Sequence, residues 1–172
     1  MLAFWPSAGA EKWFKRDDAF DAEIRDRFHG LYEAAARSDV SGWEETPEGV
    51  LALIIVLDQF PRNLFRGAPR TYATDRTARD IADRALARDF DREAPQELRS
   101  FFYLPFMHSE ELADQERCVA LYRAAGDPDL KWAEHHADII RRFGRFPHRN
   151  RILGRTTTPE EQAFLEVDKF GT

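Results

Sequence analysis

The chain has 172 residues, of which 43% are hydrophobic and 33% charged, a balance typical of one soluble globular domain. Its 9 glycines and 9 prolines exclude a collagenous or low-complexity chain, and a formal charge of −6 excludes a general nucleic-acid binder, which needs a basic surface. The single cysteine, Cys118, excludes an intrachain disulfide. We expect a cytoplasmic protein without a signal peptide or membrane span, because the longest apolar run, residues 50–57, is far shorter than the roughly 20 residues that a span needs.

Apolar residues recur at helical spacing from the start of the chain. Asp17 is the expected N-cap of a first long helix that ends near Ser38. Thr46 and a following proline open the next helix, which is apolar on all sides over residues 50–57 and is therefore predicted to be buried. A buried strand is the alternative, but the Thr-Pro start and the lack of partner strands favour a helix. We expect this central helix to end near Phe60, before a proline.

Further helices follow a turn region over residues 61–72. The capping and spacing signals predict helices that begin near residues 75, 95, 109, 128 and 159. The last of them starts with a capping box, Thr158 at the N-cap and Glu161 three residues later. Because no convincing strand appears, the predicted class is all-α, with one domain over residues 1–172.

Four polar residues stand where the central helix ends: Asp58, Gln59, Arg62 and Asn63. Buried polar groups without partners cost about 1–3 kcal/mol each, so these side chains must find partners or open onto a cavity. Two interpretations stay open, a network that ties down the following turn and a set of ligand-facing groups.

A second cluster begins at His108 and Glu110 and continues through further acids and an amide to residue 115. Histidine and carboxylates at this spacing can bind a metal ion, but no known metal-binding pattern is present, and we predict no metal and no cofactor. The alternative is a set of acids that complement a helix N-terminus.

The third cluster, residues 141–155, contains six arginines, one histidine and no acid inside an acidic protein. Arginine presents a planar fork of donors that fits carboxylates and phosphates. The candidate ligand-binding residues here are Arg142, Arg145, His148, Arg149 and Asn150. In the alternative interpretation the arginines pair internally with acids such as Glu110 and Asp58.

Together these motifs resemble the bacterial family called domain of unknown function 924. The resemblance covers nearly the whole chain and is carried by residues 57–63, 104–110, 114–115, 142–150 and 153–155. It implies an α-helical fold similar to the tetratricopeptide-like superfamily, with stacked antiparallel helix pairs around residues 50–57. It implies no established activity.

Our first hypothesis is a protein that binds a small phosphate or carboxylate compound, or an acidic peptide end, in a groove lined by Arg, Asn and His. Its ligand-binding residues would be Asp58, Gln59, Arg62, Asn63, Arg142, Arg145, His148, Arg149 and Asn150. An enzyme is the second hypothesis, with His108 or His148 as general acid or base tuned by Glu110 or Asp58, and an arginine that stabilises developing negative charge. The third is a purely structural helical scaffold. Neither nucleic acid nor membrane is an expected partner, and the sequence does not give the oligomeric state.

Overall fold

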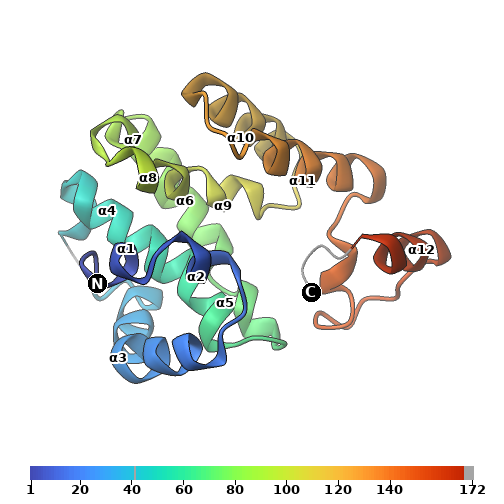
Figure 1. Cartoon of the computed structure of the whole chain (residues 1–172), viewed down its shortest axis with the longest axis horizontal. Coiled ribbons are helices and arrows are strands. Elements are labelled where there is room, and N and C mark those ends of the chain that lie inside the picture. The colour runs from blue at the N-terminus through green and yellow to red at the C-terminus, as the bar shows by residue number, and fades with distance from the viewer. Residues whose placement is uncertain (41, 169–172) are drawn as a thin grey trace. The chain divides into compact units, whose positions relative to one another are not determined.

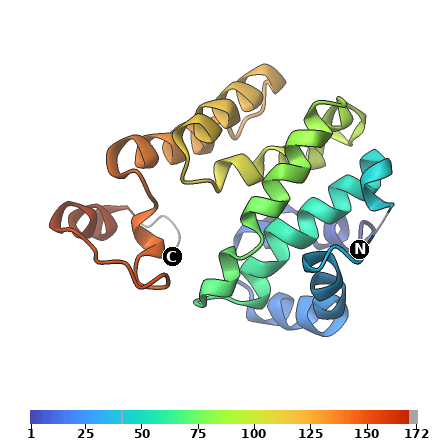
Figure 2. The same ribbon diagram turned by 180° about the vertical axis from the view of Figure 1, so that it is seen from behind.

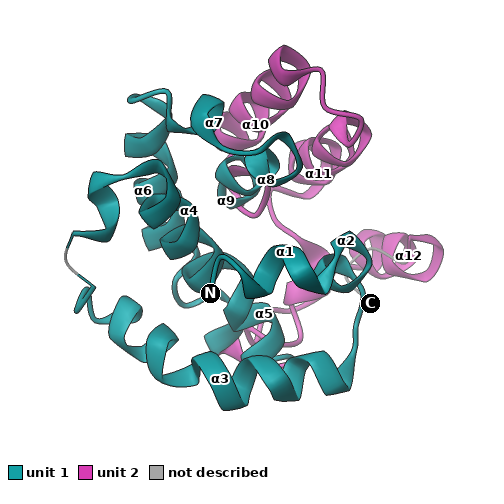
Figure 3. Cartoon of the chain, turned by 60° about the vertical axis from the view of Figure 1, so that its left-hand side comes forward, with its two compact units in different colours: residues 1–66, 70–105 teal, residues 67–69, 106–172 magenta. Residues whose placement is uncertain are grey.

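The computed structural model describes residues 1–40 and 42–168, and the chain divides into two compact units (Figures 1 and 3). The first unit comprises residues 1–66 and 70–105, and the second comprises residues 67–69 and 106–172. The described residues form helices and no strand, which confirms the all-α class. None of the helices within the described ranges combines the length and apolarity that crossing a membrane requires. The expectation of a single domain over residues 1–172 stays a prediction.

The helices up to residue 107 lie wholly or partly in the first unit. In chain order they are α1 (Phe4–Ala8), α2 (Ala10–Phe14), α3 (Asp18–Ala36), η1 (Trp43–Glu45), α4 (Pro47–Ile54), η2 (Ile55–Gln59), α5 (Phe60–Leu64), η3 (Pro69–Tyr72), α6 (Asp75–Leu86), α7 (Phe90–Glu93), α8 (Gln96–Arg99), η4 (Ser100–Phe102) and α9 (Leu104–Met107). The apolar run 50–57 is at most 5% exposed, which confirms the predicted buried central helix. Helix α4 packs along α6, and α5 packs against α3 (Figure 2).

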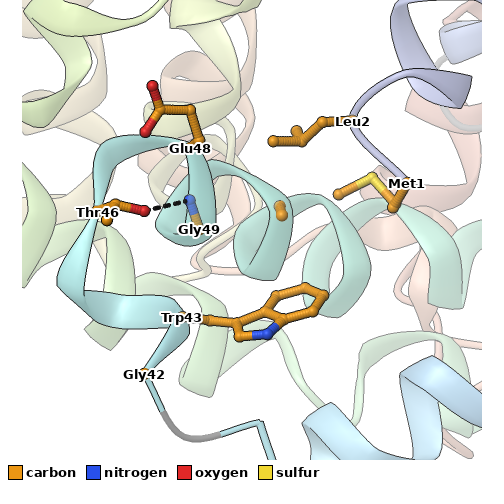
Figure 4. Close-up of a pocket in the computed structure, with 8 residues that line it drawn as sticks. Met1, Leu2, Gly42, Trp43, Thr46, Glu48 and Gly49 are labelled. Carbon is orange, nitrogen blue, oxygen red and sulfur yellow. Dashed lines mark hydrogen bonds between the residues drawn. The ribbon is translucent and has the colours of Figure 1, made fainter.

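Two helices of this unit, α3 and α4, begin at their predicted N-cap residues. The Asp17 side chain accepts hydrogen bonds from the main-chain N–H groups of the first turn of α3, and the Thr46 side chain accepts one from Gly49 N–H in α4 (Figure 4). Each cap satisfies donors that a helix start leaves without an intrahelical partner.

The central helix does not end near Phe60 as predicted. It passes through a π-helical turn, η2, and continues as α5 to Leu64. Pro61 has no N–H to give to the Leu57 carbonyl one turn earlier, and Thr74 Oγ1 donates to that oxygen instead at 2.6 Å. The helix therefore continues past the proline, because the side chain of Thr74, the residue before α6, replaces the missing donor.

The second unit contains a helical hairpin and a C-terminal helix. Its elements are α10 (Leu112–Ala125), α11 (Leu130–Phe143), η5 (Pro147–Arg149) and α12 (Pro159–Val167). Helices α10 and α11 pack together, and Gly126, with φ +63°, makes the left-handed turn that ends α10. Ile139, Ile140 and Phe146 form an apolar core. The capping box of Thr158 and Glu161 is present as predicted.

Candidate functional site

The polar residues at and just after the end of η2 form hydrogen bonds and an ion pair within the first unit. Asp58 is fully buried and accepts a hydrogen bond from Gln59 Nε2 at 2.5 Å. The Arg62 guanidinium donates to both carboxylate oxygens of Asp75, at 2.9 and 3.1 Å, and to the main-chain oxygen of Asp58 at 2.6 Å. Burial alone would lower the pKa of Arg62, but the charges of Asp58 and Asp75 outweigh it and raise that pKa. Arg62 is thus a permanent cation tied to α6.

Asn63 contributes to a different contact, which we call the Asp21 clamp. Asp21 of α3 is 6% exposed and accepts from Asn63 Nδ2 at 2.8 Å. The Arg66 guanidinium donates to both oxygens of the same carboxylate, at 2.5 and 2.9 Å. An asparagine and an arginine from the end of the central helix therefore fasten a buried carboxylate of α3.

The second unit repeats this arrangement in what we call the Glu161 clamp. Arg145 donates to the two oxygens of Glu161 at 2.6 and 2.9 Å, and Asn150 Nδ2 donates to Oε2 at 3.1 Å. Glu161 is 3% exposed, and its hydrogen bond from Arg145 is the main cause that lowers its pKa to about 2. Residues 60–63 read Phe-Pro-Arg-Asn and residues 146–150 read Phe-Pro-His-Arg-Asn, and in both segments the asparagine shares a buried carboxylate with an arginine.

Glu110, a predicted partner of a catalytic histidine, is engaged elsewhere. Its carboxylate accepts two hydrogen bonds from Arg155, both 2.8 Å long, and one from Phe146 N–H at 2.8 Å. Burial would raise the pKa of Glu110, but these donors and the charge of Arg149 lower it. The group is a fixed anion under ordinary conditions, which suits ion pairing better than proton transfer. The interpretation of internal pairing therefore holds for Arg155 and Glu110.

Histidines gather in the second unit. His136 of α11 contacts Phe146 edge-on, with ring centroids 5.7 Å apart, and Phe146 in turn contacts His148 at 5.6 Å. Burial is the main cause that lowers the pKa of His136 to about 3; the hydrogen bond to the Trp132 carbonyl opposes it, and the nearby imidazoles of His108, His135 and His148 contribute to the lowering. We call these four residues the imidazole cluster.

His136 has a defined tautomer. Its Nδ1 lies 2.7 Å from the main-chain oxygen of Trp132, and a carbonyl oxygen can only accept, so Nδ1 carries the proton. With a pKa of about 3 the ring is neutral at pH 7. Its Nε2 is therefore a hydrogen-bond acceptor.

Arg149 lies beside the imidazole cluster. Its side chain is buried, its guanidinium stands 4.6 Å above the Phe146 ring, and its Nη2 donates to the main-chain oxygen of His108 at 2.9 Å. Arg142, in contrast, is exposed on α11, where it covers the rings of Phe143 and Phe164 at 4.8 and 5.3 Å. Arg149 and His148 thus come together with His108, whereas Arg142 does not join them.

The sequence analysis did not predict two sets of contacts, those of Asp21 and Asp75 with arginines and that of His135 with Asp168. Asp21 and Asp75 were not recognised as the partners of the arginines, because no local pattern connects residues so far apart in the chain. His135 Nε2 also lies 2.9 Å from Asp168 Oδ2. In the described part of the chain no three His, Cys, Asp or Glu side chains are arranged to hold a metal ion. The predicted meeting of the two polar clusters, which lie in different units, stays a prediction.

The chain is similar over nearly its whole length to one protein family and to one solved structure. The model of the family described as "Bacterial protein of unknown function (DUF924)" matches residues 1–168. A solved structure of a protein of unknown function from Agrobacterium tumefaciens is 51% identical, with a TM-score of 0.94, and the match covers 97% of this chain and 95% of that one. No curated protein matches the chain.

Proposed function

The chain belongs to the DUF924 family of bacterial proteins of unknown function, and we propose that it binds a small anion of the phosphate or carboxylate class through its second unit. Among the predicted ligand-binding residues, Arg62, Asn63, Arg145 and Asn150 already hold internal carboxylates. The proposal concentrates on His108, His148 and Arg149, because Arg149 donates to the main-chain oxygen of His108 and both Arg149 and His148 contact the Phe146 ring.

The imidazole cluster is the observation that carries the proposal. Three imidazoles act electrostatically on His136, and Arg149 comes from the same turn as His148. A guanidinium and several imidazoles that lie close together form a region of positive potential, which attracts anions. A bound phosphate or carboxylate would interact favourably with these groups.

Each group has a suitable role in anion binding. The Arg149 guanidinium is planar and can donate two parallel hydrogen bonds to a carboxylate or phosphate. The imidazole N–H groups of His148 and His108 can donate hydrogen bonds to the oxygens of the anion.

The experiment is a calorimetric titration of the full chain with inorganic phosphate and with succinate at pH 6.5. We expect saturable binding. Arg149→Gln should abolish it, whereas Arg151→Gln should leave it unchanged, because Arg151 is an exposed arginine of the same segment. Since Arg149 is buried, His148→Asn is a second test on a less buried side chain, and it should weaken binding. Equal loss in the Arg151 variant would contradict the proposal.

A helical interaction scaffold is the second candidate function. Four guanidinium groups bind internal carboxylates, those of Arg62, Arg66, Arg145 and Arg155, and this favours a structural role for the motifs. The hairpin of α10 and α11 is also the kind of helix pair that a tetratricopeptide-like protein stacks. Absence of heat for every anion, together with a folded Arg149 variant, would favour the scaffold.

A further inference from the structure

The η5 loop, which we define as residues 146–155, carries His148 and Arg149 of the proposed anion site. Main-chain hydrogen bonds of 2.8–3.0 Å give the loop a shape of its own, and they are donated by the N–H groups of Arg149, Asn150, Leu153 and Arg155. These bonds join residues within the loop only. The position of Arg149 and His148 relative to His108, which lies on a separate segment, must therefore depend on other contacts.

Both ends of the η5 loop meet at one carboxylate, that of Glu110. The Phe146 N–H donates to Oε1 at 2.8 Å, and the Arg155 guanidinium donates to both carboxylate oxygens at 2.8 Å each. Glu110 follows His108 by two positions in the chain. One side chain thus joins the first and the last residue of the loop to the segment that carries His108.

A third contact attaches the middle of the loop to the same segment. Arg149 Nη2 donates to the main-chain oxygen of His108 at 2.9 Å. Attachment at three points, Phe146, Arg149 and Arg155, fixes the orientation of the loop as well as its distance from residues 108–110. Glu110 provides two of these three contacts, so most of the attachment depends on its carboxylate.

The charge of Glu110 by itself opposes anion binding. Its carboxylate interacts electrostatically with Arg149, and a fixed negative charge near a site repels an incoming anion. Arg155 offsets this charge through its two hydrogen bonds. A role through position and a role through charge therefore predict opposite results when the charge is removed. The first predicts weaker anion binding, and the second predicts stronger binding.

We propose that Glu110 is a positioning residue of the anion site, which closes the η5 loop at both ends and holds Arg149 and His148 in place at the segment of His108. This inference rests on the proposed function, because it gives Glu110 a role in the same site. Glu110 donates nothing to the anion. Its hydrogen bonds order the loop in advance, so less conformational freedom is lost when an anion binds.

The first test measures amide hydrogen exchange by NMR in the full chain without ligand. Glu110→Gln should speed exchange of the loop amides, such as that of Arg149, by about 10-fold or more, because hydrogen bonds to a charged group are lost. Amides in the middle of α10 and α11 should be unaffected. The variant should stay folded, because Arg145 still donates to Glu161 and to the main-chain oxygen of Thr156. Unchanged exchange in the loop would overturn the inference.

Calorimetric titration with inorganic phosphate at pH 6.5 then measures the consequence for binding. We expect Glu110→Gln to weaken binding by about 3-fold or more, because the apparent affinity falls with the fraction of molecules in which the loop is in place. Glu111→Gln is the matched control, because Glu111 is the exposed acid next in the chain and its side chain makes no capping hydrogen bond. It should bind phosphate as the parent chain does. Equal or tighter binding by Glu110→Gln would overturn the inference.

A second variant covers the case in which Glu110→Gln does not fold. Arg155→Lys keeps the positive charge but cannot donate two parallel hydrogen bonds to Glu110. It should also loosen the loop and weaken phosphate binding, whereas Arg151→Lys, at an exposed arginine of the same loop, should not. Equal phosphate affinity in the two lysine variants would overturn the inference. A parent chain that binds no phosphate would refute the proposed function itself, whereas unchanged loop exchange refutes only the role of Glu110.

Discussion

Replacing Glu161 by glutamine should destabilise the second unit markedly. Glu161→Gln keeps the shape of the side chain but removes its charge and one acceptor. The buried carboxylate accepts two hydrogen bonds from Arg145, one from Asn150 and one from the main-chain N–H of Thr158. The variant would leave the Arg145 guanidinium beside an amide that cannot balance it.

The expected magnitude follows from these contacts. Removing one partner of a buried ion pair costs about 3–5 kcal/mol, and hydrogen bonds to charged groups contribute about 1.5–3 kcal/mol each. Because glutamine keeps one acceptor oxygen, we expect a loss of about 2–3 kcal/mol in the free energy of unfolding. For a chain of this length that corresponds to a fall in Tm of about 5–10 °C.

The assay is urea unfolding followed by circular dichroism, with Glu160→Gln as control. Glu160 is the exposed neighbour in the same first turn of α12. The pKa of Glu161 in the folded protein, about 2, lies below its ordinary value of 4.5. Its stabilisation is therefore complete above about pH 4.5 and disappears as the pH falls toward 2. The difference between parent chain and Glu161→Gln should shrink over that interval.

Two results would refute this reasoning. One is equal stability of Glu161→Gln and Glu160→Gln at pH 7. The other is a difference between parent chain and Glu161→Gln that stays constant from pH 6 to pH 2.5, because a carboxylate that loses its charge cannot keep its ion pair.

Three further predictions concern other positions. Thr74→Val should cost about 1–3 kcal/mol in urea unfolding, because the π-helix carbonyl loses its donor, while Thr74→Ser should be nearly neutral. Gly49→Ala should lower Tm through its clash with the Trp43 main chain, whereas Gly30→Ala, in a helix with open space around it, should raise stability by about 0.5–1 kcal/mol. Burial raises the pKa of the Cys118 thiol to about 12, so a disulfide reagent at pH 8 should modify it only at the rate of unfolding, and rapid reaction of the native chain would contradict its burial.

Local signals in the sequence predicted the helices well. The N-caps at Asp17 and Thr46 and the capping box at Thr158 depend on residues only a few positions apart, so their hydrogen bonds can be anticipated from spacing alone. The burial of residues 50–57 likewise follows from a segment that is apolar on every face.

The π-helical turn could not be anticipated in the same way. Pro61 normally favours a helix end at the preceding residue. The helix continues because Thr74, thirteen positions further on, supplies the missing hydrogen bond. A compensation made by tertiary contact leaves no mark in the local pattern.

The carboxylate partners of the arginines also could not be predicted from the local sequence. The sequence indicated that residues 141–155 concentrate guanidinium groups, but not which of them bind carboxylates within the protein. Arg145 meets Glu161 across 16 positions and Arg155 meets Glu110 across 45. Only the folded arrangement distinguishes these structural arginines from Arg149, which lies with the imidazole cluster.

The most direct measurement of the proposed anion site is an NMR titration of the histidine side chains with inorganic phosphate at pH 6.5. All five histidines can be followed together, and His29, on α3 of the first unit, serves as an internal reference. The account predicts saturable shifts of the His108 and His148 imidazole resonances with His29 unchanged. Unchanged resonances for all five, or shifts of His29 equal to those of His148, would contradict it.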